Sequence, residues 1–537
     1  MSKQEQFLQH ITEGYTFKGP SLDLGGAMLD GECVPGAIVK VPLKTINRHG
    51  LIAGATGGGK TKTLQILAEQ FSLQGIPSLL MDIKGDLSGI AMPGASNAKI
   101  VERHSKIGIP FTAAGSPVEF LSLSDEQGAR LRATVTEFGP VLFSRILGLN
   151  DTQSSIISVV FKYCDDKDLP LLDLQDMRKV LQYITSDGKT EIEAAYGRVS
   201  LDSVGTILRK IVELEQQRAD MFFGELSFEV NDLCRTDAQG RGMISIVRLT
   251  DIQDRPKLFS TFMLQMLAEI YATFPETGDV EKPKLAIFID EAHLVFSEAS
   301  KTLLNQIEAI VRLIRSKGVG VFFVTQNPTD IPESVLGQLG MKVQHALRAF
   351  TAKDRKAIKL AAENYPISNF YNVGDTITQL GIGEAFVTVL NEKGIPTPLA
   401  HVMLRAPQSR MDVLTDEEIN GIINRSELVR KYNQVVDRKS AHEILTAKME
   451  EAHEAARQEE LRKQQEKVMV QPRTTSTTSR STRAPKSTIE QIIGSPTTRQ
   501  IGNTIARELT RGLLGVLGMG GTTTRRRTTT TTTRRKK

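Results

Sequence analysis

A glycine-rich segment near the start of the chain has the residues needed to hold phosphate groups. Residues 54–61 read GATGGGKT and fit the pattern GxxxxGK[ST]. Glycines let backbone N–H groups turn toward phosphate oxygens, while Lys60 reaches the β- and γ-phosphates and the Thr61 hydroxyl ligates Mg²⁺. We therefore predict a nucleotide loop; a glycine-rich turn before a helix is the alternative. The predicted contacting residues are Gly54, Ala55, Thr56, Gly57, Gly58, Gly59, Lys60, Thr61 and Lys62.

Two adjacent carboxylates follow an apolar run in the segment LAIFIDEAH. In a P-loop ATPase, an acid at a strand end holds the Mg²⁺, often through water. A second acid directly after it can deprotonate the attacking water. We predict Asp290 as the metal-site acid and Glu291 as the catalytic base, at the end of a strand that runs beside the phosphate loop. The alternative is a solvated helix start, with His293 packing or hydrogen bonding locally.

Polar residues end two further predicted strands. Gln326 follows the run VGVFFVT, where an amide can touch the γ-phosphate and report its loss, so we predict it to be the sensor. The alternative is a glutamine that opens a turn before Pro328. In MDIKGD, Asp82 and Asp86 are expected close to the same site, where Asp86 either positions water or metal or belongs to a polar turn.

Arginines are candidates because a cation stabilises the charge that develops in phosphoryl transfer, and a neighbouring subunit often supplies it. Arg312 and Arg315 lie three residues apart in IVRLIRSKG, just before the sensor strand, and Arg348 lies in HALRAF. Each of the three is a candidate for the catalytic arginine. Ordinary surface arginines on a helix are the alternative for each of the three.

Short apolar runs alternate with helical periods from about residue 48 to 390, as in a parallel α/β sheet. Their near-continuous apolar character suits strands covered on both faces. We predict a RecA-like core at 46–405, preceded by a short lead-in at 1–45 with turn-rich stretches such as Gly25-Gly26 and Pro35-Gly36. The predicted strands are 50–54, 78–83, 243–249, 284–290, 319–325 and 384–390.

Helical patterns dominate the rest of the chain. Residues at about 124–235 are predicted to be a helical insertion, and 406–470 a charged helical region. Residues 471–537 are a low-complexity basic tail expected to be disordered, with an amphipathic helix at about 499–517. In the insertion, a helix capped by Asp202 or Ser203 shows one apolar face: Val204, Ile207, Leu208, Ile211 and Leu214.

The net charge of +5 hides an uneven distribution along the 537 residues. The tail has fourteen Lys/Arg against two acids, whereas the first 470 residues have 53 basic and 60 acidic side chains. A nucleic-acid footprint on the body must therefore be a local patch.

The three cysteines lack metal spacing and are predicted to be reduced thiols. With neither a signal peptide nor a spanning segment expected, we predict a cytoplasmic protein.

These motifs together resemble the bacterial HerA-like ATPases, within the HerA/FtsK group of P-loop translocases. The resemblance covers most of residues 45–520. It is carried by NRHGLIAGATGGGKT at 47–61, MDIKGDLSG at 81–89, PKLAIFIDEAHLVF at 283–296, VRLIRSKGVGVFFVTQNPTDIP at 311–332, VQHALRAFTAKDRKA at 343–357 and IARELTRGLLG at 505–515.

This resemblance implies a RecA-like ATPase, usually a hexameric ring that threads duplex DNA through its channel, with ATP bound between subunits. Archaeal HerA proteins begin with a β-barrel; only a short lead-in precedes the phosphate loop here, so the type without the barrel is expected. By position it implies Lys60 and Thr61 as phosphate and Mg²⁺ ligands, Asp290 as metal-site acid, Glu291 as base, Gln326 as sensor and Arg315 as the trans-acting arginine.

Three functional hypotheses stay open at this point. The leading one is an ATP-driven motor acting on DNA as an oligomeric ring. The second is an ATPase switch or assembly factor that acts on a protein partner, docked through the C-terminal amphipathic helix. The third uses that helix as a membrane-surface anchor, although its apolar stripe is narrow. ATP is expected over GTP from the resemblance, and because no NKxD-type stretch follows the acidic strand.

Two single substitutions test the predicted chemistry. Lys60→Ala removes the phosphate-contacting cation, and Glu291→Gln removes the base while keeping its shape. Each is expected to lower the rate of ATP hydrolysis at least about 100-fold, the usual contribution of such groups. Steady-state phosphate release measures this, and a full rate in either variant would contradict the assigned roles.

Overall fold

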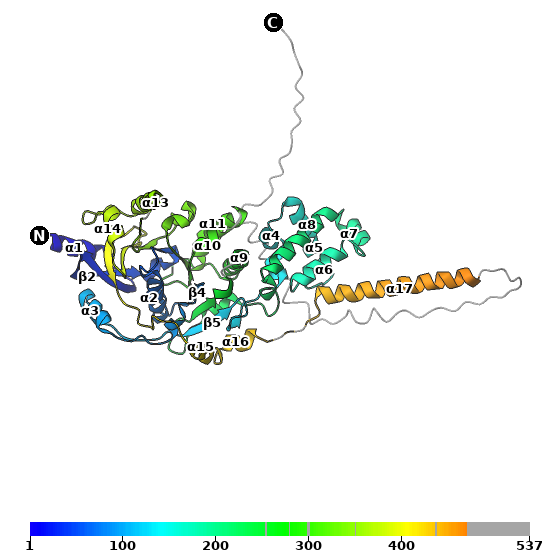
Figure 1. Cartoon of the computed structure of the whole chain (residues 1–537), viewed down its shortest axis with the longest axis horizontal. Coiled ribbons are helices and arrows are strands. Elements are labelled where there is room, and N and C mark those ends of the chain that lie inside the picture. The colour runs from blue at the N-terminus through cyan, green and yellow to red at the C-terminus, as the bar shows by residue number, and fades with distance from the viewer. Residues whose placement is uncertain are drawn as a thin grey trace, which may run out of the picture.

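The computed structural model describes residues 1–469 except 253–254, 279, 298–300, 350, 435 and 437. The predicted basic tail at 471–537, including the helix expected at about 499–517, therefore lies outside the described residues. Within the described part, one large sheet runs through the centre, helices cover both of its faces, and a helical lobe lies at one end (Figure 1).

The sheet has twelve strands in the described part of the chain, in the order β2-β1-β12-β11-β10-β3-β9-β8-β4-β7-β5-β6. Neighbouring strands from β10 to β6 pair in parallel, so the predicted mostly parallel α/β core is confirmed. All six predicted strands are present. The strands are β1 (Ser21–Leu29), β2 (Glu32–Pro42), β3 (Gly50–Ala53), β4 (Ser78–Asp82), β5 (Val118–Ser122), β6 (Ala129–Arg130), β7 (Ile244–Arg248), β8 (Leu285–Ile289), β9 (Val319–Thr325), β10 (Met341–Gln344), β11 (Glu384–Thr388) and β12 (Ala400–Leu404).

Residues 1–45 are more ordered than the turn-rich lead-in that we predicted. They form helix α1 (Lys3–Tyr15) and the long strands β1 and β2, which extend the sheet: β1 pairs antiparallel with β12, and β2 pairs antiparallel with β1. Gly25 suggested a turn, but it lies within β1 because the neighbouring strand is close: a Cβ there would lie 2.1 Å from the Met403 carbonyl oxygen. The glycine thus marks a close approach between strands.

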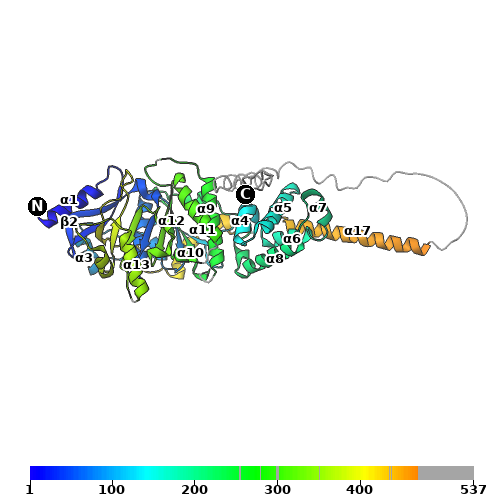
Figure 2. The same ribbon diagram turned by 90° about the horizontal axis from the view of Figure 1, so that it is seen from above.

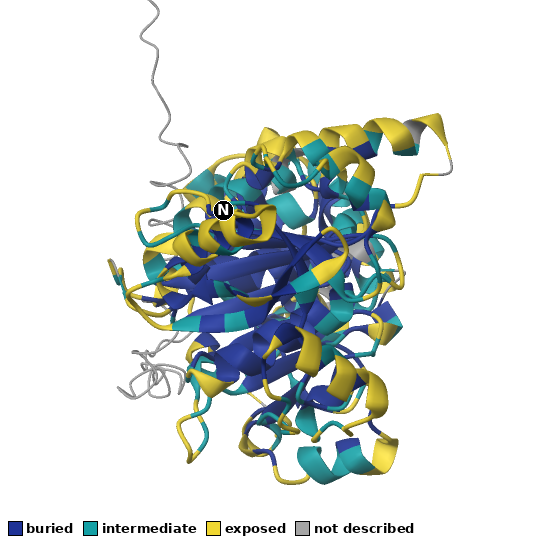
Figure 3. Ribbon diagram, turned by 90° about the vertical axis from the view of Figure 1, so that its left-hand side faces the viewer, coloured by how far each residue is buried: buried dark blue, intermediate teal, exposed yellow. Residues whose placement is uncertain are grey.

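Alternate residues of the central strands supply two separate apolar cores. In β9, Val321 and Phe323 face the core shared with the helical lobe, while Phe322 and Val324 face the core under α2. Figure 3 shows the strands buried between more exposed helices. The helices other than α1 are α2 (Lys60–Leu73), α3 (Ala98–Ile107), α4 (Val135–Ile146), α5 (Asp151–Asp166), α6 (Leu174–Tyr183), α7 (Lys189–Tyr196), α8 (Leu201–Gln216), α9 (Pro256–Thr273), α10 (His293–Ser297), α11 (Lys301–Ile314), α12 (Glu333–Leu336), α13 (Ala352–Glu363), α14 (Val373–Gln379), α15 (Asp416–Ile423), α16 (Glu427–Tyr432) and α17 (Ala441–Met469).

Helices α4–α8 occupy the segment predicted as a helical insertion and gather at the end of the molecule away from α1 (Figures 1 and 2). The helix expected from its apolar spacing is α8, but its cap is Ser200, whose side chain accepts from the Ser203 N–H. Ser200, rather than Asp202 or Ser203, is the cap because the helix begins at Leu201, earlier than predicted. α17 starts against α6 and then extends away from the body.

No helix among the described residues is both long and apolar enough to cross a bilayer.

An aromatic cluster beneath α2 is expected to hold the phosphate-loop helix against the sheet. The Phe322 ring lies 4.8 Å from that of Phe288 and 5.7 Å from that of Phe71, and all three are fully buried. Phe322→Ala should lower the free energy of unfolding by about 3–5 kcal/mol, because it leaves a cavity in a packed core. Urea denaturation measures this. Leu360→Ala, at a half-exposed position on α13, is the control; an equal effect of both substitutions would contradict the expectation.

Candidate active site

Four neighbouring parallel strands bring the predicted chemistry to one edge of the sheet. The phosphate loop follows β3, Gln326 follows β9, Asp290 follows β8, and Asp82 ends β4. The acidic strand β8 does not pair with β3, because β9 lies between them. The phosphate loop and the acid pair therefore flank the strand that carries the predicted sensor.

The phosphate loop is a left-handed turn that only glycine adopts without strain. Gly57 and Gly59 have φ values of 80° and 114°, and an added Cβ at Gly57 would meet open space. The Ala55 N–H donates to the Ala346 carbonyl at 2.8 Å, which ties the loop to the chain after β10. α2 then begins at Lys60 without a side-chain cap. Its first N–H groups thus remain free to bind an anion.

The lysines of the loop have different environments. Lys60 is buried, and its Nζ donates to the Ala55 carbonyl at 3.3 Å. Burial lowers the pKa of Lys60, the charge on Lys84 lowers it further, and Glu291 and Asp290 oppose both. Thr61 is partly exposed at the start of α2.

Lys62 instead reaches the chain beyond β12. Its Nζ donates to the Met411 carbonyl, and Gln65 and Glu69, further along the same face of α2, hold neighbouring residues of that segment. Glu69 accepts from the Ser409 hydroxyl at 2.9 Å. Lys62 was predicted to contact the nucleotide; the geometry gives it a second task, since it fastens the C-terminal region to the phosphate-loop helix.

His345 lies directly beneath the phosphate loop and was missed as a site residue by the sequence analysis. An added Cβ at Gly54 would lie 2.5 Å from the His345 Cβ, so the loop packs onto this ring. The ring nitrogens contact the Thr63 hydroxyl at 2.8 Å and the Glu384 carbonyl at 2.9 Å. Burial lowers the pKa of His345 to about 4. A polar residue at the end of the strand in VQHAL was the available signal.

Asp290 has the features of a magnesium ligand. It is 2% exposed, and among the described residues its Oδ2 atom has no hydrogen-bond partner. Burial raises the pKa of Asp290 to about 6, Lys84 acts to lower it, and Glu291 to raise it. Mg²⁺ in such sites takes one or two protein oxygens and completes its shell with phosphates and water. Asp290 with Thr61 fits such a partial set.

Glu291 follows in a left-handed conformation, with φ at 46°, which costs a non-glycine residue energy. Its carboxylate is buried and forms an ion pair with Lys84, while the other oxygen lies 3.2 Å from the His293 Nδ1. His293 is thus close to Glu291, as its expected local role requires. The sequence analysis missed Lys84, although it lies between the two acids of MDIKGD.

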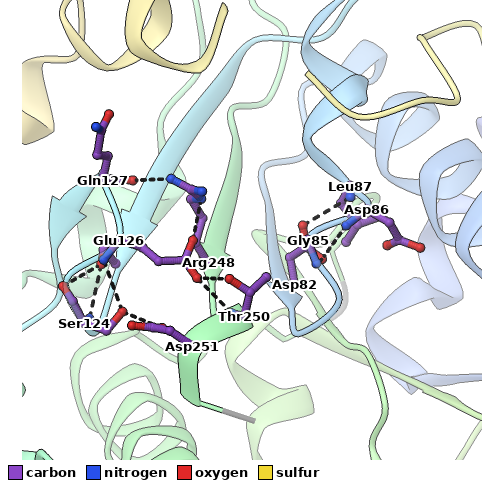
Figure 4. Close-up of polar contacts among 11 residues, drawn as sticks. Asp82, Gly85, Asp86, Leu87, Ser124, Glu126, Gln127, Arg248, Thr250 and Asp251 are labelled. Atoms are coloured by element: carbon purple, nitrogen blue, oxygen red, sulfur yellow. Dashed lines mark hydrogen bonds and ion pairs between the residues drawn. The ribbon is translucent and has the colours of Figure 1, made fainter. Parts of the chain in front are cut away.

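Asp82 caps the loop that carries Lys84, as Figure 4 shows. Its carboxylate accepts from the backbone N–H groups of Gly85, Asp86 and Leu87 at 2.8–3.2 Å. Burial raises the pKa of Asp82 to about 7, against the effect of these hydrogen bonds. Asp82 therefore shapes the loop, while the Asp86 side chain points away from it.

A polar network beside Asp82 fixes the ends of β5 and β7 (Figure 4). Glu126 pairs with the Arg248 Nε at 2.8 Å and accepts from the Thr250 N–H at 2.9 Å. The Ser124 hydroxyl donates to Asp251 at 2.7 Å. These residues gave no motif signal because they meet only through the sheet, and they stiffen the edge next to the site.

The candidate arginines lie at two opposite edges of the sheet. Arg315 opens the turn before β9, so the length of β9, about 20 Å at ~3.3 Å per residue, separates it from the phosphate-loop edge. Arg312 and Arg315 are exposed there and line a cavity of about 420 Å³. Arg348 follows β10 at the phosphate-loop edge and donates to the Thr378 carbonyl. Arg315 therefore cannot reach the nucleotide of its own chain.

Because His345 is buried, the free energy of unfolding is expected to depend on pH in the acid range. In the folded protein the pKa of His345 is about 4, below the usual value of about 6.5. Its contribution to the free energy of unfolding is therefore complete above pH 6.5 and is lost as the pH falls toward 4. Over that range the wild type should lose on the order of 3 kcal/mol more than His345→Gln. Urea midpoints at several pH values measure the difference; parallel curves for the two proteins would contradict it.

Comparison with protein families gives one match over most of the chain. The family model described as "Helicase HerA-like C-terminal" matches residues 29–525. The DNA double-strand break repair helicase HerA of Sulfolobus acidocaldarius is 21% identical over 368 residues, 67% of this chain and 66% of the relative. That of Saccharolobus solfataricus is 21% identical over 359 residues, 65% and 63% of the two chains. The chain thus spans just under two thirds of these curated relatives.

Solved structures show weaker likenesses. The bacterial conjugative coupling protein TrwB has 15% identity and a TM-score of 0.47, covering 76% of this chain and 94% of its own. VirB4 of Thermoanaerobacter pseudethanolicus has 14% identity and a TM-score of 0.47, covering 73% and 98%.

Proposed function

Because the chain belongs to the helicase HerA-like C-terminal family, we propose that it is an ATP-hydrolysing motor that works on duplex DNA as an oligomeric, hexameric ring. The observation that carries this proposal is the meeting of the phosphate loop, Asp290 and Glu291 at one edge of a parallel sheet. The proposed compartment is the cytoplasm.

The proposed chemistry needs few residues. The phosphate loop and Lys60 hold the β- and γ-phosphates of ATP, and Asp290 with Thr61 holds Mg²⁺, which neutralises phosphate charge when bound. Glu291 takes a proton from water as the water oxygen bonds to the γ-phosphorus. The bond from that phosphorus to the bridging oxygen breaks, releasing ADP and phosphate. Gln326, exposed after β9, is proposed to sense this loss.

The position of Arg315 supports the proposed ring. It is exposed at the edge opposite the phosphate loop, so it can contribute to catalysis only at the nucleotide of a neighbouring chain. A head-to-tail arrangement places opposite edges of adjacent subunits together, and such an arrangement closes into a ring when the rotation permits. We therefore propose Arg315 as the trans-acting arginine.

Duplex DNA is proposed as the track because two curated relatives are named DNA double-strand break repair helicases. The acidic excess of the first 470 residues favours the second candidate, an ATPase switch for a protein partner docked through the C-terminal amphipathic helix. The two functions differ in their response to DNA and to salt.

Hydrolysis with and without linear duplex DNA separates these functions. A DNA motor should hydrolyse ATP several-fold faster with duplex, and the stimulation should fade between about 50 and 200 mM salt as counterions compete for phosphate contacts. Phosphate release at both salt concentrations measures this, with Lys60→Ala as the control. Robust hydrolysis indifferent to duplex would reject the DNA motor and favour the protein-directed switch.

Mixing two inactive variants tests the trans role of Arg315. Arg315→Ala keeps its own Glu291 but lacks the arginine, and Glu291→Gln keeps the arginine but lacks the base. Each alone should be at least about 100-fold slower than wild type, while mixed rings regain activity at sites that combine both intact residues. Arg209→Ala, at an arginine of the distant helix α8, is the control. Absence of rescue in confirmed mixed rings would contradict the proposal.

A further inference from the structure

Among the described residues, two side chains and no backbone N–H group contact the carboxylate proposed as catalytic base. Glu291 is 6% exposed at its side chain, yet neither oxygen accepts a hydrogen bond from a backbone N–H among the described residues. Its partners are the Lys84 Nζ on one oxygen and the His293 Nδ1 on the other. A buried carboxylate needs a compensating charge or donors. These two side chains therefore determine where the carboxylate lies.

Lys84 is the permanent cation of the two. Burial lowers the pKa of Lys84, but its hydrogen bond to Glu291 and the charges of Asp290, Glu291 and Asp86 outweigh burial and raise it. His293 carries a charge only when protonated, and it lies two residues from Glu291, at the start of α10. Lys84 lies in the loop after β4, so it connects the base to a separate segment of the chain.

The loop that presents Lys84 is itself rigidly built. Buried Asp82 accepts from the three N–H groups that follow Lys84, and Gly85 takes a left-handed φ of 75°. β4 pairs with β8, so the strands that precede Lys84 and Glu291 are hydrogen-bonded neighbours. The pairing of β4 with β8 therefore fixes the distance between the Lys84 and Glu291 side chains.

We propose that Lys84 is a positioning residue, which holds the Glu291 carboxylate in place for proton removal from the attacking water. The inference rests on the proposed ATPase function and adds a residue to it. Lys84 acts through Glu291 and differs in this from Lys60, which lies in the phosphate loop. Its loss would leave a buried carboxylate free to turn toward other partners, and small displacements of a catalytic group are costly.

The test compares Lys84→Met, Lys84→Arg and the control Lys106→Met. Lys106 also forms a Lys–Glu ion pair, with Glu102 at 2.8 Å, on the distant helix α3. For Lys84→Met, kcat for ATP should fall roughly 10- to 100-fold, with KM within about twofold of wild type. Lys84→Arg should recover most of the loss because it keeps the charge. Lys106→Met should match wild type.

A second measurement separates positioning from phosphate binding. The dissociation constant for a slowly hydrolysed ATP analogue should be the same in Glu291→Gln and in the double variant with Lys84→Met. A weaker analogue affinity in the double variant, or a raised KM with normal kcat, would overturn the inference in favour of direct phosphate contact. A normal kcat, or an unfolded Lys84→Met protein, would also overturn it. Lack of hydrolysis by the wild type would instead reject the proposed function.

Discussion

The parallel pairing of β3, β9, β8 and β4 is the constraint on which the site depends. Parallel strands end at the same edge, so residues 54–61, 290–291, 326 and 82–86 meet although more than 200 positions separate some of them. The apolar residues that alternate between two cores fix the register of these strands. A shift by one residue would turn Asp290 away from its neighbours and into the opposite core.

That shared edge concentrates charge in a buried place, and the fold balances it with cations and hydrogen bonds. Asp82, Asp290 and Glu291 are all buried within a few residues of strand ends. Backbone N–H groups satisfy Asp82, Lys84 pairs with Glu291, and Asp290 keeps an oxygen that has no hydrogen-bond partner in the described part of the chain. Unpaired buried polar atoms are uncommon and costly, so the free oxygen of Asp290 is the natural place for a bound cation.

Local sequence could predict the elements that carry strong motifs, but not the contacts between them. The six strongly apolar strands were found, whereas β1, β2, β5, β6, β10 and β12 were missed; β10 and β12, with the sequences MKVQ and AHVML, are partly polar. The order of β3, β9 and β8 could not be predicted, since no single strand's sequence determines its neighbours in the sheet. His345 and Lys84 become site residues only through packing across strands. The pair Gly25-Gly26 in β1 indicated a turn because glycine is favoured both in turns and where two strands lie close together.

Movement along duplex DNA is the central claim, and displacement of a third strand from a DNA triplex tests it most directly. A protein that translocates should release the bound strand when ATP is supplied, from linear tracks at salt concentrations that permit binding. Lys60→Ala and a slowly hydrolysed ATP analogue should release none. Hydrolysis of ATP on the same DNA without any strand release would contradict a translocating motor.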